Sequence, residues 1–112
     1  MSTRSLEQPR WQQYFDELSQ SLGAVRIDLQ IDGENLGAQQ GLADARLLGM
    51  SYDEDEDVFW LGTEAMEHRI ASPQQITVRE SGGRLSAVEI VDGEGLHHVV
   101  ILREAPRLER HI

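Results

Sequence analysis

A run of five consecutive carboxylates is the most conspicuous chemistry in the chain. Asp53, Asp55 and Asp57 match positions 1, 3 and 5 of a calcium-binding loop of the EF-hand type, and Glu64 matches position 12. The match then fails, because position 6 is Val58, where such a loop needs glycine for its sharp turn. We interpret the acidic run as a solvated turn between two strands, with weak Ca²⁺ or Mg²⁺ binding as the alternative.

Three histidines offer a second kind of chemistry. His97 and His98 are adjacent, so on a strand their rings point to opposite faces and cannot bind one ion together. A zinc site would need one of them beside His68 and a carboxylate, with each imidazole held by a further acceptor. His68 could also be the base of a hydrolytic set with Glu67 and Ser72, or with the first residue of the acidic run. No nucleophile elbow, phosphate-binding glycine loop or diagnostic metal spacing supports these sets, so we predict no cofactor, no metal and no enzymatic activity.

The apolar run of residues 58–61, directly after the acidic turn, contains Phe59 and Trp60. Neighbouring residues of a strand point to opposite faces, so both faces of this strand need cover. Most such side chains belong to the core, but an exposed one would mark a surface for a protein partner. Phe59, Trp60 and His68 are therefore the candidate interaction residues.

The composition limits the classes of partner. The chain has 112 residues, with 20 acidic against 10 basic side chains and a net charge of -10. This charge repels phosphate and anionic lipid, so we expect neither a nucleic-acid nor a membrane partner. Cysteine is absent, which excludes thiolate metal sites and disulfides and fits the reducing cytosol. No apolar run approaches the roughly 20 residues of a membrane span, and a cytoplasmic location is expected.

The first expected element is a helix over residues 9–22. Pro9 suits the first position of a helix, and apolar residues then recur with helical spacing along one face. These residues are Trp11, Tyr14, Phe15, Leu18 and Leu22. A lone helix of this length is marginal in water, so the apolar face must pack on the rest of the chain.

The remainder of the chain predicts strands joined by short turns. A change of phase between Leu47 and Leu48 predicts a bulge or bend within one of them. No second helix is predicted that could carry a parallel crossover, so the sheet should be antiparallel throughout. The strands are expected over residues 25–31, 42–52, 58–61, 76–80, 84–91 and 96–103, with a short extension at 68–70.

The predicted fold is α+β and mainly β. An N-terminal helix packs on a five- or six-stranded antiparallel sheet that is strongly curled or forms a small open barrel. Residues 9–104 are expected to form a single compact domain. Residues 1–8 and 105–112 are predicted to be flexible termini.

Three motifs resemble a small prokaryotic family of uncharacterised proteins, a domain of unknown function. They are Trp-x-x-Tyr-Phe-Asp-x-Leu-Ser starting at Trp11, Leu-Gly-Met-Ser-Tyr-Asp ending at Asp53, and His-x-Ile-x-x-Pro-x-x-Ile-x-Val starting at His68. The resemblance covers most of residues 9–103 and implies a common compact domain, with no catalytic residues. The order of the elements also resembles the Sm-like barrel, in topology only, because the RNA-binding signatures are not visible.

The sequence thus favours a small cytosolic, non-enzymatic domain that acts through protein contacts, by self-association as a homodimer or as an accessory to another protein. The alternative is a small-molecule-binding or hydrolytic domain with a pocket near His68 and Trp60. A third hypothesis is an acidic mimic of nucleic acid, which would need carboxylates spread in a stripe rather than gathered in one turn.

Overall fold

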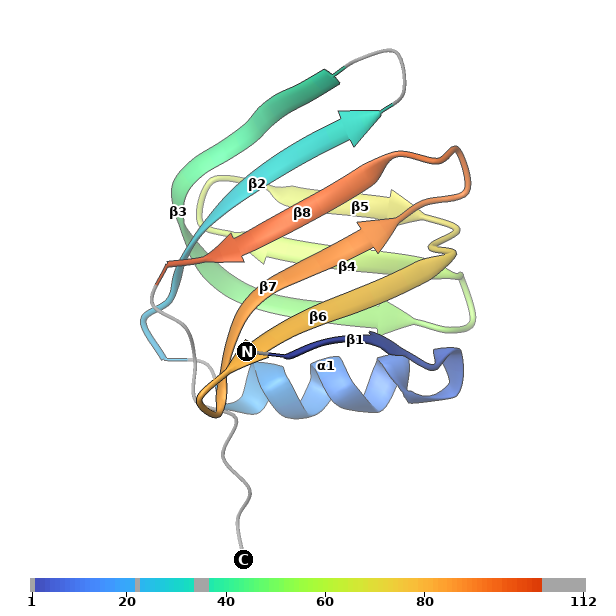
Figure 1. The fold of residues 1–112 in the computed structure, drawn as a ribbon, viewed down its shortest axis with the longest axis horizontal. Helices are drawn as coiled ribbons and strands as arrows, with labels where there is room; N and C mark the ends of the chain where they lie inside the picture. Colours follow the sequence, from blue (N-terminus) through green and yellow to red (C-terminus); the bar gives the residue numbers. More distant parts are fainter. Residues whose placement is uncertain (1, 22, 34–36, 104–112) are drawn as a thin grey trace, which may run out of the picture.

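A computed structural model describes residues 2–21, 23–33 and 37–103, which form one α-helix and eight strands (Figure 1). The helix is α1 (Trp11–Gln20), preceded by one 3-10 turn, η1 (Gln8–Arg10). The strands are β1 (Ser2–Leu6), β2 (Arg26–Gly33), β3 (Gly37–Asp53), β4 (Val58–Thr63), β5 (Glu67–Ala71), β6 (Gln75–Ser81), β7 (Arg84–Val91) and β8 (His97–Leu102).

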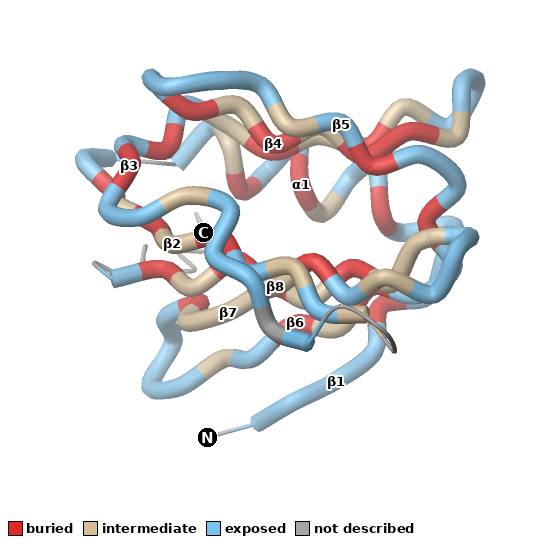
Figure 2. The backbone as a smooth tube through the Cα atoms, turned by 90° about the horizontal axis from the view of Figure 1, so that it is seen from above, coloured by how far each residue is buried: buried red, intermediate tan, exposed pale blue. Residues whose placement is uncertain are grey.

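The strands form one open sheet in the order β1-β6-β7-β8-β2-β3-β4-β5, and every neighbouring pair is antiparallel. Strand β3 is long enough to belong to two layers, because its first part pairs with β2 and its second part with β4. We call β1, β6, β7, β8, β2 and the first part of β3 the large layer, and the second part of β3 with β4 and β5 the small layer. Both layers contain buried residues (Figure 2).

A bulge marks the place where β3 passes from one layer to the other. The pairing of β3 with β4 shifts in register between Leu47 and Gly49. Leu48 at this bulge is 61% exposed, whereas Leu47 is buried. The change of phase predicted between Leu47 and Leu48 is confirmed, because the additional residue at a bulge turns the apolar side of the strand to the other face.

The helix covers the end of the space between the layers with an aromatic cluster. Trp11, Phe15 and Leu18 are buried on one face of α1, as their spacing predicts. Trp11 meets Tyr52 of β3 edge to face, with ring centroids 5.1 Å apart. Phe15 meets Phe59 of β4 in the same way, at 4.9 Å. Edge-to-face pairs add to the stabilisation by burial, so these contacts hold α1 to the small layer.

A serine of the helix bonds to the edge of the sheet. The Ser19 hydroxyl donates to the Met50 carbonyl oxygen at 2.7 Å and accepts from the Met50 N–H at 3.1 Å. Met50 lies in the second part of β3, whose side away from β4 faces α1 rather than another strand. The backbone groups that a sheet edge would leave open are therefore satisfied here by one side chain.

The coarse fold prediction is confirmed, and three details differ. Residues 2–6 form β1 on β6 instead of a frayed terminus, and only Leu6 among them is buried, so no apolar alternation indicated a strand. The strands number eight rather than five or six, since β1 and the full strand β5 were not counted. The predicted helix extends over 9–22 but α1 spans Trp11–Gln20, while Leu22 and the tail 105–112 lie outside the described residues.

The Sm-like barrel is not supported, because a strand precedes the helix and the sheet is not closed. None of the helices described is long and apolar enough to cross a membrane.

Candidate functional site

The acidic run forms the turn between β3 and β4. Asp53 Oδ1 accepts the N–H groups of Asp55 at 2.9 Å and Glu56 at 3.2 Å, which closes the turn. The Tyr52 hydroxyl donates to Asp57 Oδ1 at 2.7 Å, and Asp57 adopts a left-handed φ of 55°. Two of these carboxylates therefore stabilise a hairpin, in agreement with the turn interpretation.

Glu64, the fourth residue of the calcium hypothesis, lies beyond the opposite end of β4. Its Oε1 accepts the Arg46 N–H at 3.3 Å and lies 3.6 Å from a guanidinium nitrogen of Arg26. The six residues of β4 separate it from Asp57 by about 20 Å. The EF-like set is thus not assembled, and within the described residues no group of three or more His, Asp and Glu side chains is placed to hold a metal ion.

The predicted interaction residues do not share one surface. Phe59 is fully buried in the core, whereas Trp60 points to the outer face of the small layer, where the Arg69 guanidinium lies 6.0 Å from its ring centroid. His68 pairs with Leu61 in register and so points to the core face with Phe59. The side chains of His68 and Trp60 therefore lie on opposite faces of the small layer.

His68 instead meets a histidine of the large layer. Its Nε2 lies 3.0 Å from Nδ1 of His98 on β8, and Nε2 of His98 lies 2.9 Å from Oδ2 of Asp92. The side chains of His98 and Asp92 are only 6% and 12% exposed, and His68 is half-buried. We call these three residues the Asp92–His98–His68 chain, which links the β7–β8 turn to the edge strand β5.

Asp92 is fixed in an ionised form by its own turn. Its Oδ1 accepts the N–H groups of Glu94 at 2.9 Å and Leu96 at 3.0 Å. Burial alone would raise the pKa of Asp92, but the hydrogen bonds from His98, Leu96 and Glu94 outweigh burial and hold the pKa below its usual value. Asp92, the buried end of the Asp92–His98–His68 chain, is consequently an anion at neutral pH.

The opposite end of the Asp92–His98–His68 chain is the uncharged imidazole of His68. Burial lowers the pKa of His68, and the positive charge that His98 can carry lowers it further. His68 is therefore neutral at pH 7, as a general base or a metal ligand must be.

This pKa shift predicts a loss of stability in acid. The unfolded chain protonates His68 near its ordinary pKa of about 6.5, while the folded protein binds that proton only at lower pH. The contribution of His68 is complete above about pH 6.5 and is lost as the pH falls through the folded pKa. Urea unfolding from pH 7.5 to 5 should show this decline, and His68→Gln should reduce it. His97→Gln, on the outer face, should retain it; the same pH dependence in His68→Gln would contradict the assignment.

The hydrolytic set proposed from the sequence is not brought together. Among the described residues no hydrogen bond joins His68 to Glu67 or Ser72, and Glu67 points to the opposite face of β5. Ser72 follows the end of β5 in a left-handed conformation, φ 53°, and its N–H donates to the Asp57 carbonyl oxygen at 2.9 Å. The backbone of Ser72 thus stabilises the turn that leads to β6.

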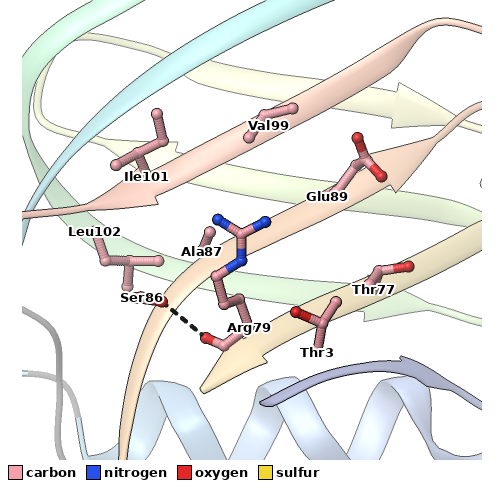
Figure 3. A pocket seen from close by; sticks show the side chains of 9 residues that line it. All are labelled: Thr3, Thr77, Arg79, Ser86, Ala87, Glu89, Val99, Ile101 and Leu102. Atoms are coloured by element: carbon pink, nitrogen blue, oxygen red, sulfur yellow. Dashed lines mark hydrogen bonds between the residues drawn. The ribbon is translucent and has the colours of Figure 1, made fainter. Parts of the chain in front are cut away.

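A groove of about 490 Å³ lies on the outer face of the large layer (Figure 3). Cross-strand pairing places Ala87 beside Ile101 and Glu89 beside Val99, with Arg79 next to Ala87 on β6. Val99 and Ile101 are only half-buried, whereas Val100 on the core face is buried. The groove lining consists of Thr3, Thr77, Arg79, Ser86, Ala87, Glu89, Val99, Ile101 and Leu102.

Sequence reasoning considered one of the adjacent histidines beside His68 and a carboxylate, but it did not identify Asp92, and it did not locate the groove. The groove had a signal, because the apolar residues 99–102 occupy both faces of β8 and indicate a face that needs cover. For the Asp92–His98–His68 chain the sequence did not show whether the histidines meet, since they are 30 residues apart and come together only through the packing of the two layers.

Comparison with known proteins places the chain in a family. A family model described as a family of unknown function (DUF5335) matches residues 2–111. An uncharacterised protein of Aquifex aeolicus (strain VF5) is 35% identical over 106 residues, which cover 94% of this chain and 96% of that protein. No solved structure gives a significant match. The chain therefore belongs to the DUF5335 family, whose function is unknown.

Proposed function

We propose that this protein acts through protein contacts and that it self-associates through the groove on the outer face of the large layer. The observation that carries the proposal is the half-buried apolar centre, Val99 and Ile101 with Ala87, in the middle of a face that no described element covers. Apolar surface framed by polar side chains is typical of protein interfaces.

The charges beside the groove favour a second copy as the partner. Arg79 on β6 and Glu89 on β7 border the apolar centre with opposite signs. In a two-fold arrangement the same patch meets itself, so Arg79 of each copy can face Glu89 of the other. This pairing offsets, at the contact itself, the repulsion between two chains of net charge -10.

Replacement of Ile101 by arginine is expected to abolish self-association. The variant places a charge in the apolar centre, where it would lose its water in the complex. Light scattering after size exclusion, over a range of concentrations, should show a dimer for the original chain and a monomer for Ile101→Arg.

Leu48→Arg is the matched control, because Leu48 is an exposed leucine at the β3 bulge, away from the groove. It should leave the dimer unchanged. A monomeric original chain at millimolar concentration, or equal losses in both variants, would overturn the proposal.

A further inference from the structure

The ionised carboxylate of Asp92 restricts which nitrogens of the Asp92–His98–His68 chain can carry protons. An ionised carboxylate can only accept, so His98 must donate its Nε2–H to Asp92. In the form of the chain in which both imidazoles are uncharged, His98 has its lone pair on Nδ1 and His68 donates its Nε2–H to it. The remaining nitrogen of neutral His68, Nδ1, is left with an unprotonated lone pair.

This lone pair is accessible to solvent. Nδ1 of His68 bonds to no described residue, and among these residues no buried side-chain nitrogen or oxygen lacks a partner. An atom that has neither a partner nor full burial is in contact with water. The Asp92–His98–His68 chain thus ends in an imidazole nitrogen of a residue on β5, the edge strand of the small layer.

We propose that Nδ1 of His68 is a nucleophilic site that accepts the acyl group of a neutral ester or anhydride, with His98 and Asp92 as positioning residues. The site is independent of the groove and of the proposed self-association. It uses the orienting half of a catalytic triad, a carboxylate that holds an imidazole, with a second imidazole as the reacting group.

The reaction balances with the atoms present. The Nδ1 lone pair attacks the carbonyl carbon and forms an N–C bond, and the C–O bond to the leaving group breaks with its electron pair. The positive charge that develops on His68 is relieved because its Nε2–H can pass to Nδ1 of His98, beside the Asp92 carboxylate. Water then adds to the acyl carbon, and the N–C bond breaks with its electron pair returning to Nδ1. The proton on His98 returns to Nε2 of His68, one proton of the water passes to the leaving group, and the carboxylic acid leaves.

The electrostatics of the protein favour a neutral carbonyl compound over a phosphoryl donor. The net charge of -10 repels anionic phosphates. The carboxylate of the Asp92–His98–His68 chain is buried behind His98, and its negative charge does not attract an anion either.

The first test reads the tautomers directly. Long-range ¹H–¹⁵N NMR at neutral pH should show His68 unprotonated at Nδ1 and protonated at Nε2. Asp92→Asn should reverse the tautomers of both histidines, because the asparagine can donate from its N–H₂ group to Nε2 of His98, which then acts as an acceptor. His68 would then carry its proton on Nδ1.

The second test measures acylation with diethyl pyrocarbonate, a neutral anhydride, followed by peptide mass analysis. His68 should be modified in the original chain and at least about tenfold more slowly in Asp92→Asn, since the accessible nitrogen is then protonated. His97, on the outer face and bonded to Glu89, is the internal standard and should react equally in both proteins. Glu94→Gln is the matched control, because it removes a carboxylate of the same turn that does not bond to His98.

Three results would overturn the proposal: a protonated Nδ1 on His68 in the original chain, no modification of His68 while His97 reacts, or equal rates in Asp92→Asn. If Asp92→Asn does not fold, the NMR measurement and the His68 modification in the original chain decide alone.

Discussion

Replacement of Phe59 by alanine is expected to lower the free energy of unfolding by about 3–5 kcal/mol. The Phe59 ring is fully buried, and its edge-to-face contact with Phe15 joins the helix to the small layer. The cavity cannot collapse easily, because its walls belong to α1 and to a strand whose other neighbours are fixed by the sheet. Urea unfolding followed by circular dichroism measures the loss.

Trp60→Ala provides the comparison for this prediction. Trp60 is the next residue on the same strand, but it lies half-buried on the outer face against Arg69. Trp60→Ala should lower the free energy of unfolding clearly less than Phe59→Ala, although tryptophan is the larger side chain. Equal losses would mean that the outer face of β4 is as tightly packed as the core.

Replacement of Asp92 by alanine is expected to lower the free energy of unfolding by about 3 kcal/mol. The change removes the acceptor for three donors at once: the backbone N–H groups of Glu94 and Leu96, and Nε2 of the buried His98. A buried donor without an acceptor loses its hydration energy in full. The loss is measured by urea unfolding at pH 7.5.

Asp92→Asn should restore most of this loss, because its side-chain oxygen still accepts from the two backbone groups. Glu94→Ala, in the same turn, should change the stability by less than about 0.5 kcal/mol, since its side chain is exposed. A loss in Glu94→Ala as large as that in Asp92→Ala would show that the turn, and not the three hydrogen bonds, determines the effect.

The parts of the fold that were predictable are those whose residues carry a strong pattern. The alternation from Val25 to Ile31 identifies β2, and the helical spacing of Trp11, Phe15 and Leu18 identifies α1, because burial on one face imposes a period. Strand β1 carries no such pattern. Its side chains are polar and exposed, and pairing with β6 alone makes it a strand.

The candidate site was less accessible to sequence reasoning. Trp60 and His68 are both conspicuous in the sequence, but their faces depend on the register of β4 with β5, where Leu61 and not Trp60 lies opposite His68. A shift by one residue would have put them on the same face. The meeting of His68 with His98 depends further on how closely the two layers pack, which no local pattern encodes.

The bond between Ser19 and Met50 also limits how this protein can polymerise. An unpaired strand edge can form backbone hydrogen bonds with a strand of another molecule. In β3 the Ser19 hydroxyl already bonds to the N–H and carbonyl oxygen of Met50. Removal of the oxygen in Ser19→Ala would leave an N–H and a carbonyl group open beneath the helix. The hydroxyl therefore protects the small layer against strand addition at this edge, and β1 and β5 remain the edges on which another strand can pair.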